Sequence, residues 1–142
     1  MRREILIGVG VSLALVSLSA CQTDSRQQLL ATSESQVALR SIQTRFFDTT
    51  DRNKTLRTSI ATLQDLGFVI DEADADLGAV SATKLDRYML RMTVTVRPRG
   101  QTQVLVRANA QYQNQEVTEP EPYQNFFVAL ERAMFLTAHQ VD

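Results

Sequence analysis

Apolar and polar residues alternate most regularly in the second half of the chain, where the pattern predicts two long antiparallel strands. The apolar positions of the first strand are Tyr88, Leu90, Met92, Val94 and Val96, and those of the second are Val104, Val106, Ala108, Ala110 and Tyr112. The sequence PRGQ at positions 98–101 lies between them and is typical of a turn. We therefore expect a hairpin with one buried face and one face exposed to water.

Shorter runs on the N-terminal side add three more strands. Residues 37–48 (VALRSIQTRFFD) alternate imperfectly, which predicts a strand with a bulge near Arg40. Residues 68–71 and 77–84 predict two further strands, joined by an acidic turn at residues 72–76.

The apolar spacing changes to that of a helix in two places. Leu56, Ile60 and Leu63 recur at i, i+4 and i+7, and one of the polar residues TTD at positions 49–51 would cap the start of this helix. A second helix begins near Pro122, where proline is well tolerated. Its apolar stripe comprises Phe126, Phe127, Leu130, Met134 and Phe135.

Gly67 marks the end of the first helix. It suits the left-handed C′ position, and Phe68 is placed to pack on Leu63, as in a Schellman motif. The order of elements is then β-α-β-β-β-β-α. This order predicts an α+β fold in which two helices pack on the apolar face of an antiparallel sheet.

The N-terminus has the layout of a secretory signal peptide. Arg2 and Arg3 precede an uncharged, mostly apolar run at positions 5–18 (ILIGVGVSLALVSL). A helix over these residues would span roughly 21 Å, less than the roughly 30 Å hydrocarbon core of a bilayer. We therefore expect a cleaved signal at residues 1–20, and not a permanent transmembrane helix.

The sequence LSAC at positions 18–21 resembles the lipobox of bacterial lipoproteins. This resemblance implies that Cys21 becomes the mature N-terminal residue and carries a diacylglyceryl group and an N-linked acyl chain such as palmitate. Two or three acyl chains hold a protein on a membrane far more firmly than one chain does. Gln22 follows the cysteine, which under enterobacterial sorting rules implies the periplasmic face of the outer membrane. The alternative is a free cysteine after an ordinary secretory signal.

These patterns divide the chain into three parts. We expect the signal peptide at 1–20, the lipidated cysteine and a flexible polar tether at 21–36, and a single α+β domain at 37–142. Leu29 and Leu30 interrupt the polar tether and offer an alternative, a short helix docked on the domain or on the membrane.

Composition excludes several classes of protein. The 142 residues include 15 Lys and Arg against 16 Asp and Glu, which gives no basic footprint for nucleic acid. A hydrophobic fraction of 44% is too high for a disordered chain. A single Cys and a single His allow neither an internal disulfide nor a cysteine-rich zinc site.

Candidate chemistry is sparse. The acidic residues between positions 65 and 76 lack the spacing of an EF-hand, so a solvated turn explains them better than a calcium site. His139 lies close to the C-terminus, away from any candidate nucleophile. We expect no catalytic residue, no metal and no cofactor.

Basic residues gather on the face of the predicted hairpin that is exposed to water. Alternation places Arg91, Arg97 and Arg107 there, among Thr, Gln and Asn side chains. Such a face could bind an acidic partner, lipid headgroups or a glycan. The alternative is that the charges only keep an exposed sheet soluble.

Several short phrases resemble known envelope lipoproteins. The order of elements, with LGF ending a helix and LGAV beginning a strand, resembles the helix-grip domains of BamC-like lipoproteins over roughly residues 37–139. The phrases TRFFDTTD, LQDLGFVID and LGAVSATK resemble small Gram-negative lipoproteins. These families bring no catalytic residues, and the resemblance implies accessory or scaffolding work in an envelope complex.

Three hypotheses for the function follow. The first is a non-catalytic, lipid-anchored module that binds an envelope protein through Arg91, Arg97 and Arg107. The second is a carrier or sensor that holds a small lipid-like ligand between helices and sheet. Its cavity would be lined by Phe68, Leu90, Met92, Phe127 and Met134. The third is an envelope hydrolase that uses two converging carboxylates.

Overall fold

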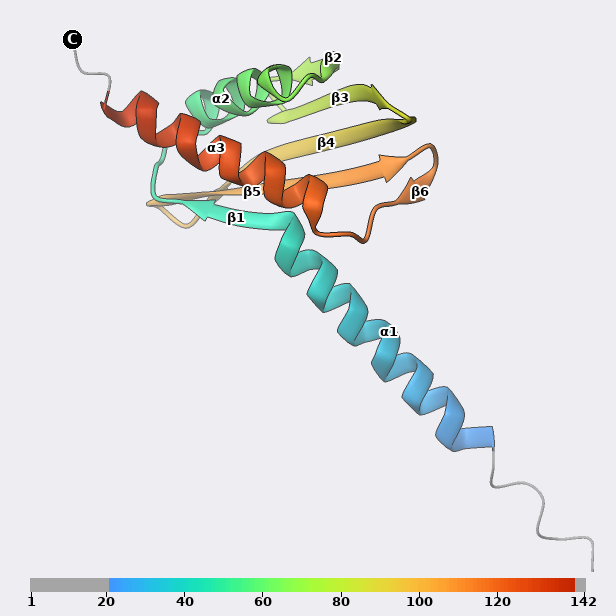
Figure 1. Cartoon of the computed structure of the whole chain (residues 1–142). Coiled ribbons are helices and arrows are strands. Elements are labelled where there is room, and N and C mark those ends of the chain that lie inside the picture. Colours follow the sequence, from blue (N-terminus) through green and yellow to red (C-terminus); the bar gives the residue numbers. More distant parts are fainter. Residues whose placement is uncertain (1–20, 140–142) are drawn as a thin grey trace, which may run out of the picture. The chain divides into compact units, whose positions relative to one another are not determined.

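The computed structural model describes residues 21–139, which form three helices and a six-stranded antiparallel sheet (Figure 1). The elements are α1 (Cys21–Gln43), β1 (Thr44–Phe47), α2 (Arg52–Asp65), β2 (Val69–Asp74), β3 (Ala79–Asp86), β4 (Tyr88–Arg99), β5 (Gln103–Tyr112), β6 (Gln115–Glu116) and α3 (Glu121–His139). The expected α+β class is thus confirmed. The signal expected at 1–20 and the side chain of Cys21 lie outside the described residues.

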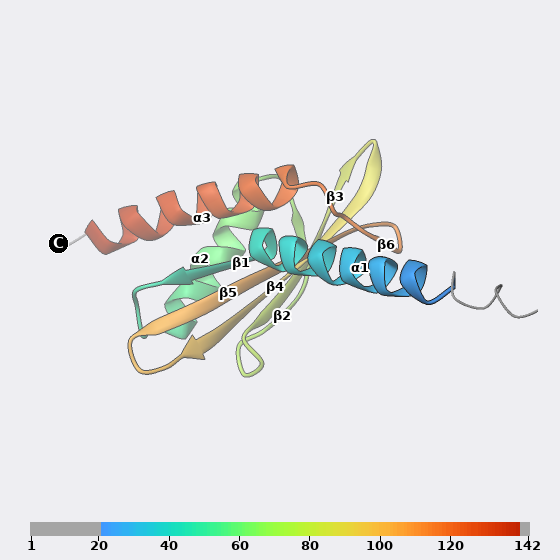
Figure 2. The same cartoon turned by 90° about the horizontal axis from the view of Figure 1, so that it is seen from below.

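The sheet has the strand order β1-β5-β4-β3-β2, and β6 pairs with the far end of β5. The expected hairpin is β4 and β5, which pair continuously from Leu90↔Tyr112 to Arg99↔Gln103. Seen from below, the strands are twisted relative to one another (Figure 2). A bulge interrupts the pairing of β2 with β3 between Ile70 and Glu72.

Helices α2 and α3 cover one face of the sheet and also contact each other (Figure 1). The core between them and the sheet contains the inward residues of β4 and β5 and the aromatic side of α3. Its largest fully buried side chains include Tyr123, Phe126, Phe127, Leu63, Met92 and Leu130. Phe135 was expected in the same stripe, but it is 63% exposed because α3 turns this position away from the core.

The N-terminal segment differs most from expectation. Residues 37–43 were expected to be a strand with a bulge near Arg40, but they continue α1, and the strand begins only at Thr44. Leu39 and Ile42 are spaced i, i+3 and pack against the core, which helical geometry allows and an alternating strand does not.

The expected flexible tether at 21–36 is helical too. The reason is local, because α1 contains neither glycine nor proline and is rich in helix-forming Gln, Leu, Ala and Arg. The chain divides into two units after Val37, and the unit Ala38–Asp142 contains the sheet.

Both ends of α2 follow the sequence signals. The Asp51 side chain accepts a hydrogen bond from the backbone N–H of Lys54 at 2.8 Å, which is the N-cap interaction. At the other end, Gly67 has a φ of 88°. The backbone N–H of Gly67 donates to the carbonyl oxygen of Gln64 and the N–H of Phe68 donates to that of Leu63, both at 2.9 Å. These two hydrogen bonds confirm the Schellman motif.

Arg52, the first residue of α2, connects the helix to the sheet. Its guanidinium Nη2 donates to the backbone carbonyl oxygens of Ala75 and Asp76, both at 2.7 Å. Its Nε donates to the backbone carbonyl oxygen of Val96 at 3.4 Å. Gly78 has a φ of 67° beside this contact, and a Cβ there would lie 2.6 Å from both Arg52 Nε and Val96 O. This position therefore requires glycine.

Candidate functional site

The face of the sheet opposite the helices is the candidate site, and we call it the outer face. Strand alternation assigns to it Thr44, Phe46, Val69, Thr83, Leu85, Met89, Arg91, Thr93, Thr95, Arg97, Leu105, Arg107 and Asn109. The intervening residues of β3, β4 and β5 are buried under α2 and α3. A one-residue change of register would exchange the two faces, so the buried core also fixes which side chains reach the outer face.

The structure places all three predicted arginines on the outer face and exposes each of them. Arg107 pairs with Thr95, and Arg97 lies two residues further along β4. Arg97 and Arg107 are therefore diagonal neighbours with Cα atoms about 7–8 Å apart. Arg91 lies four residues from Thr95 in the other direction, about 13 Å along the strand.

No acidic side chain neutralises these arginines among the residues that the structure describes. The ion pair found there joins Arg45 Nε to Glu131 Oε1 at 4.0 Å, on the side of the helices. Acidic residues do lie on β2, at the edge of the sheet, where Thr83 donates to Asp71 Oδ2 at 2.6 Å. The outer face is thus basic in the middle and acidic at one edge.

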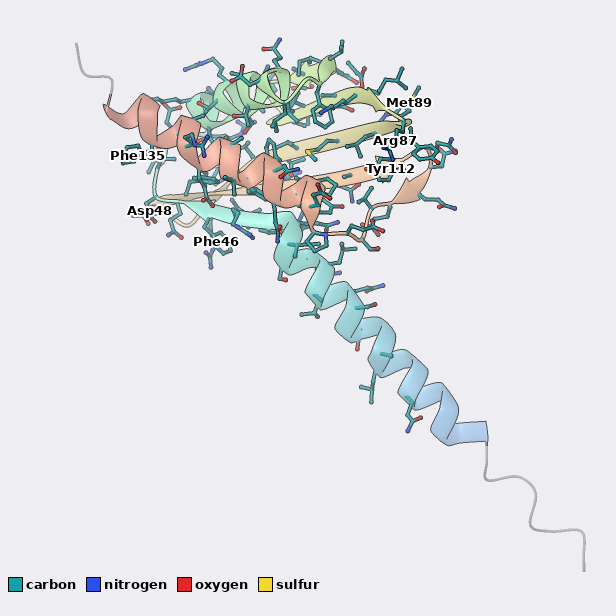
Figure 3. All side chains as sticks on the ribbon, in the orientation of Figure 1. Phe46, Asp48, Arg87, Met89, Tyr112 and Phe135 are labelled. Carbon is teal, nitrogen blue, oxygen red and sulfur yellow. The ribbon has the colours of Figure 1, made fainter. Side chains whose placement is uncertain are left out.

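Exposed apolar side chains flank the arginines, and sequence reasoning missed them. Phe46 is 48% exposed near Arg97 and Arg107, whereas Leu85 and Met89, at 82% and 50%, lie beyond Arg91. Figure 3 shows Phe46 and Met89 at opposite ends of the sheet. The available signal was alternation itself, because Met89 and Leu85 share the strand parity of Arg91.

Phe46 is held in place by a cation. The Arg99 guanidinium lies 3.5 Å from the centre of the Phe46 ring, and Gln103 donates from Nε2 to Asp48 Oδ1 at 2.6 Å. These contacts connect β1 to the turn between β4 and β5. Strand alternation already places Phe46 on the outer face, and these contacts fix the orientation of its ring there.

The space between helices and sheet is filled where a ligand cavity was expected. Met92 and Phe127 are each 1% exposed, so they line no space that a water molecule could enter. Phe68 and Leu90 border a hollow of about 240 Å³, whereas Met134 borders a different one of about 480 Å³. The five expected lining residues therefore do not share a cavity, which counts against the carrier hypothesis.

A buried polar network connects the end of α1 to the sheet. The Tyr123 hydroxyl donates to Val117 O at 2.7 Å and accepts from Ala110 N at 3.2 Å and from Gln43 Nε2 at 3.3 Å. Gln43 also donates to Glu116 Oε1 at 3.1 Å. Ala110 pairs with neither β1 nor β6, so its backbone N–H has the Tyr123 hydroxyl as its hydrogen-bond partner. The network therefore has a structural role.

Two further findings concern the described residues alone. Within 21–139, no group of three or more His, Cys, Asp or Glu side chains is placed to hold a metal ion. No helix in this range is long and apolar enough to cross a membrane.

Comparison with known proteins adds no assignment: no protein-family model matches the chain, and no curated protein sequence matches it.

Proposed function

We propose that the protein is a lipid-anchored envelope protein that acts as a non-catalytic accessory or scaffolding subunit. Its anchor is the acylated Cys21, on the periplasmic face of the outer membrane. Its outer face binds a protein partner through Arg91, Arg97 and Arg107 together with the exposed apolar side chains beside them. The support for the anchor is the LSAC sequence after an apolar run too short to cross a membrane.

One observation carries the interaction proposal. Arginines without an acidic partner among the described residues share the outer face with Phe46, Leu85 and Met89, all exposed by about half or more. Charges alone keep a sheet face soluble, whereas exposed large apolar residues that share the face with arginines provide apolar area that a partner can bury. Aromatic residues, Met and Arg are the residue types enriched at protein interfaces, where a few of them supply most of the binding energy.

The chemistry of the partner follows from the charge of the face. A complementary surface is acidic opposite the arginines and has apolar positions to receive Phe46 and Met89. The acidic edge at β2 would repel the same surface, so it sets the side from which the partner approaches.

A pull-down after crosslinking in intact cells tests the proposal. Wild type is compared with Cys21→Ala, with the triple variant Arg91→Glu/Arg97→Glu/Arg107→Glu, and with a matched triple, Arg40→Glu/Arg57→Glu/Arg132→Glu, at exposed arginines on helices. We expect the outer-face triple to recover at least about tenfold less partner, because reversed charges repel an acidic surface. The matched triple should recover as much as wild type.

The anchor is tested separately. Mass spectrometry of the mature protein should show an acylated Cys21, and Cys21→Ala should move the protein from the membrane fraction to the periplasmic fraction. An unmodified Cys21 would overturn the anchor, and full recovery of partner by the outer-face triple would overturn the interaction surface.

A further inference from the structure

A second surface lies at one end of the sheet, on the side of the helices. Tyr112 separates two adjoining hollows there, one of about 640 Å³ and one of about 240 Å³. The first is bordered by Arg87 from the β3–β4 turn, Tyr88 at the start of β4, Gln113 from the β5–β6 turn and Gln115 at the start of β6. The second extends toward α3 and is bordered by Lys84, Glu121 and Asn125, among others. We call the two hollows together the tyrosine groove.

Two aromatic rings line the larger hollow of the tyrosine groove. Tyr88 and Tyr112 meet edge to face, with ring centres 6.3 Å apart and planes at 71°. Both remain open to solvent, at 62% and 38% exposure, although they have the strand parity of the buried core residues. An edge-to-face pair leaves a ring face free for a ligand. Figure 3 shows Arg87 and Tyr112 near each other at this end of the molecule.

The backbone on both sides of the groove is in an unusual conformation. Five described residues have a positive φ, and three of them are glycines, the residue that adopts this conformation without strain. The other two are Arg87 at 58° and Gln113 at 55°, and both border the same hollow. Side chains kept at strained positions are typical of functional sites, where the chain retains them for their chemistry.

The polar groups of the tyrosine groove suit a ligand rich in hydroxyl and carboxylate groups. Gln113, Gln115 and Asn125 each carry an amide that can donate and accept. Arg87 forms no ion pair with any side chain that the structure describes. The smaller hollow adds one positive side chain, Lys84, and one negative side chain, Glu121. A guanidinium without an acidic partner is well suited to bind a carboxylate through two hydrogen bonds.

We propose that the tyrosine groove binds an acidic oligosaccharide, with sugar rings stacked on Tyr88 and Tyr112 and a sugar carboxylate held by Arg87. Sugar rings present flat C–H faces that pack on aromatic rings, while their hydroxyls take up hydrogen bonds from amides. Two hollows on either side of Tyr112 favour an oligomer over a single sugar. The groove is open to solvent and bordered by amide and charged side chains, which suits hydroxyl groups better than an acyl chain. This inference does not depend on the lipid anchor or on the outer face.

The chain offers a direct optical test. It contains no Trp and three Tyr, and two of these line the groove while Tyr123 is fully buried. Tyrosine fluorescence of the full chain, purified in a detergent without a sugar headgroup, therefore reports on the groove. The ligands are the hexamer of galacturonic acid, its methyl ester as the neutral counterpart, and hexaglutamate as an acidic peptide. The variants are Arg87→Gln and Tyr112→Ala, with Arg57→Gln, at an exposed arginine of α2, as the matched control.

We expect the uronic acid hexamer to change the fluorescence and to bind at least about tenfold more tightly than its ester. Arg87→Gln should weaken binding by a similar factor, since it removes a charge-assisted contact, and Arg57→Gln should change it by less than twofold. If Tyr112→Ala unfolds the protein, Arg87→Gln still decides the matter, because Arg87 is an exposed turn residue. Absence of binding, equal binding of the ester, or equal or tighter binding of hexaglutamate would each overturn the proposal.

Discussion

Arg52 shows how a single residue can join three elements. A positive charge at the start of a helix is unfavourable in the field of the helix dipole, yet here it is compensated by three backbone carbonyl oxygens. Those oxygens belong to the β2–β3 turn and to β4, so the contact ties α2 to two parts of the sheet. Gly78 makes it possible, because any side chain there would occupy the position of the guanidinium.

Replacing Gly78 tests this contact. We expect Gly78→Ala to lower the free energy of unfolding by about 2–4 kcal/mol, through backbone strain and the displacement of Arg52. The control is Gly100→Ala, at a φ of 59° with no atom within 4 Å of the added Cβ, which should cost only about 1 kcal/mol. Urea unfolding of both variants measures the difference. Equal losses would mean that the Arg52 contact contributes nothing beyond the backbone conformation.

Tyr123 is the second position where one group carries several interactions. Tyr123→Phe removes the hydroxyl that serves Val117, Ala110 and Gln43, and it leaves a buried N–H on Ala110 without a partner. We expect a loss of about 1–3 kcal/mol in the free energy of unfolding. Tyr88→Phe, at an exposed ring, is the control and should be nearly neutral. If the two variants are equally stable, the network is not a structural support.

At the scale of elements, α2 is the helix whose boundaries the sequence signals define best. The Asp51 carboxylate satisfies the Lys54 N–H and also lies at the positive end of the helix dipole. Asp51→Ala should therefore destabilise the protein by about 1 kcal/mol, whereas Asp51→Asn should lose less because it keeps the hydrogen bond. Thermal unfolding of both variants checks this order. A larger loss in Asp51→Asn than in Asp51→Ala would contradict the capping account.

The boundaries of α2 could be predicted from the sequence, whereas the end of α1 could not. Gly67 and Asp51 act within their own turn, so local chemistry alone predicts where α2 begins and ends. Residues 37–43 are different, because Leu39 and Ile42 pack against the core and Gln43 joins the Tyr123 network. Those partners come from distant parts of the chain. The apolar pattern of residues 37–48 contains no information about them, so it did not predict the helix.

The candidate site shows the same division. Alternation along β4 and β5 predicts the outward direction of Arg91, Arg97 and Arg107, because side chains on a strand have a fixed period. Alternation also directs Phe46 outward, but its contact with Arg99 comes from a distant strand, and no local pattern predicts that contact. The tyrosine groove was missed for a related reason. Tyr88 and Tyr112 have the strand parity of the core residues, yet Tyr88 is mostly exposed and Tyr112 partly exposed at the end of the sheet.

At the scale of the whole molecule, the two faces of the sheet have different roles. The helix-side face forms a close-packed core, and the outer face carries charge and exposed apolar groups. Electrostatic and apolar contributions to binding should therefore separate when the salt concentration changes. Charges on an exposed face are screened by salt, whereas burial of a phenyl ring is not.

Salt dependence of partner capture measures this separation. Between about 0.1 and 1 M NaCl the Debye length falls from roughly 10 to 3 Å, so capture by wild type should weaken strongly. Arg97→Ala/Arg107→Ala should flatten the salt dependence, whereas Phe46→Ala should lower capture at every concentration without changing the slope. Val128→Ala, at an exposed position on α3, is the control. An unchanged slope in the arginine variant would contradict the electrostatic role.

Photocrosslinking from defined positions shows whether the outer face of the sheet contacts a protein partner in the cell. A photoreactive residue replaces Thr95, which pairs with Arg107 in the middle of the outer face, or Val128, which is exposed on α3. We expect a crosslinked product of one defined mass from position 95 and none from position 128. Products from position 128 alone, or no product from position 95, would contradict it.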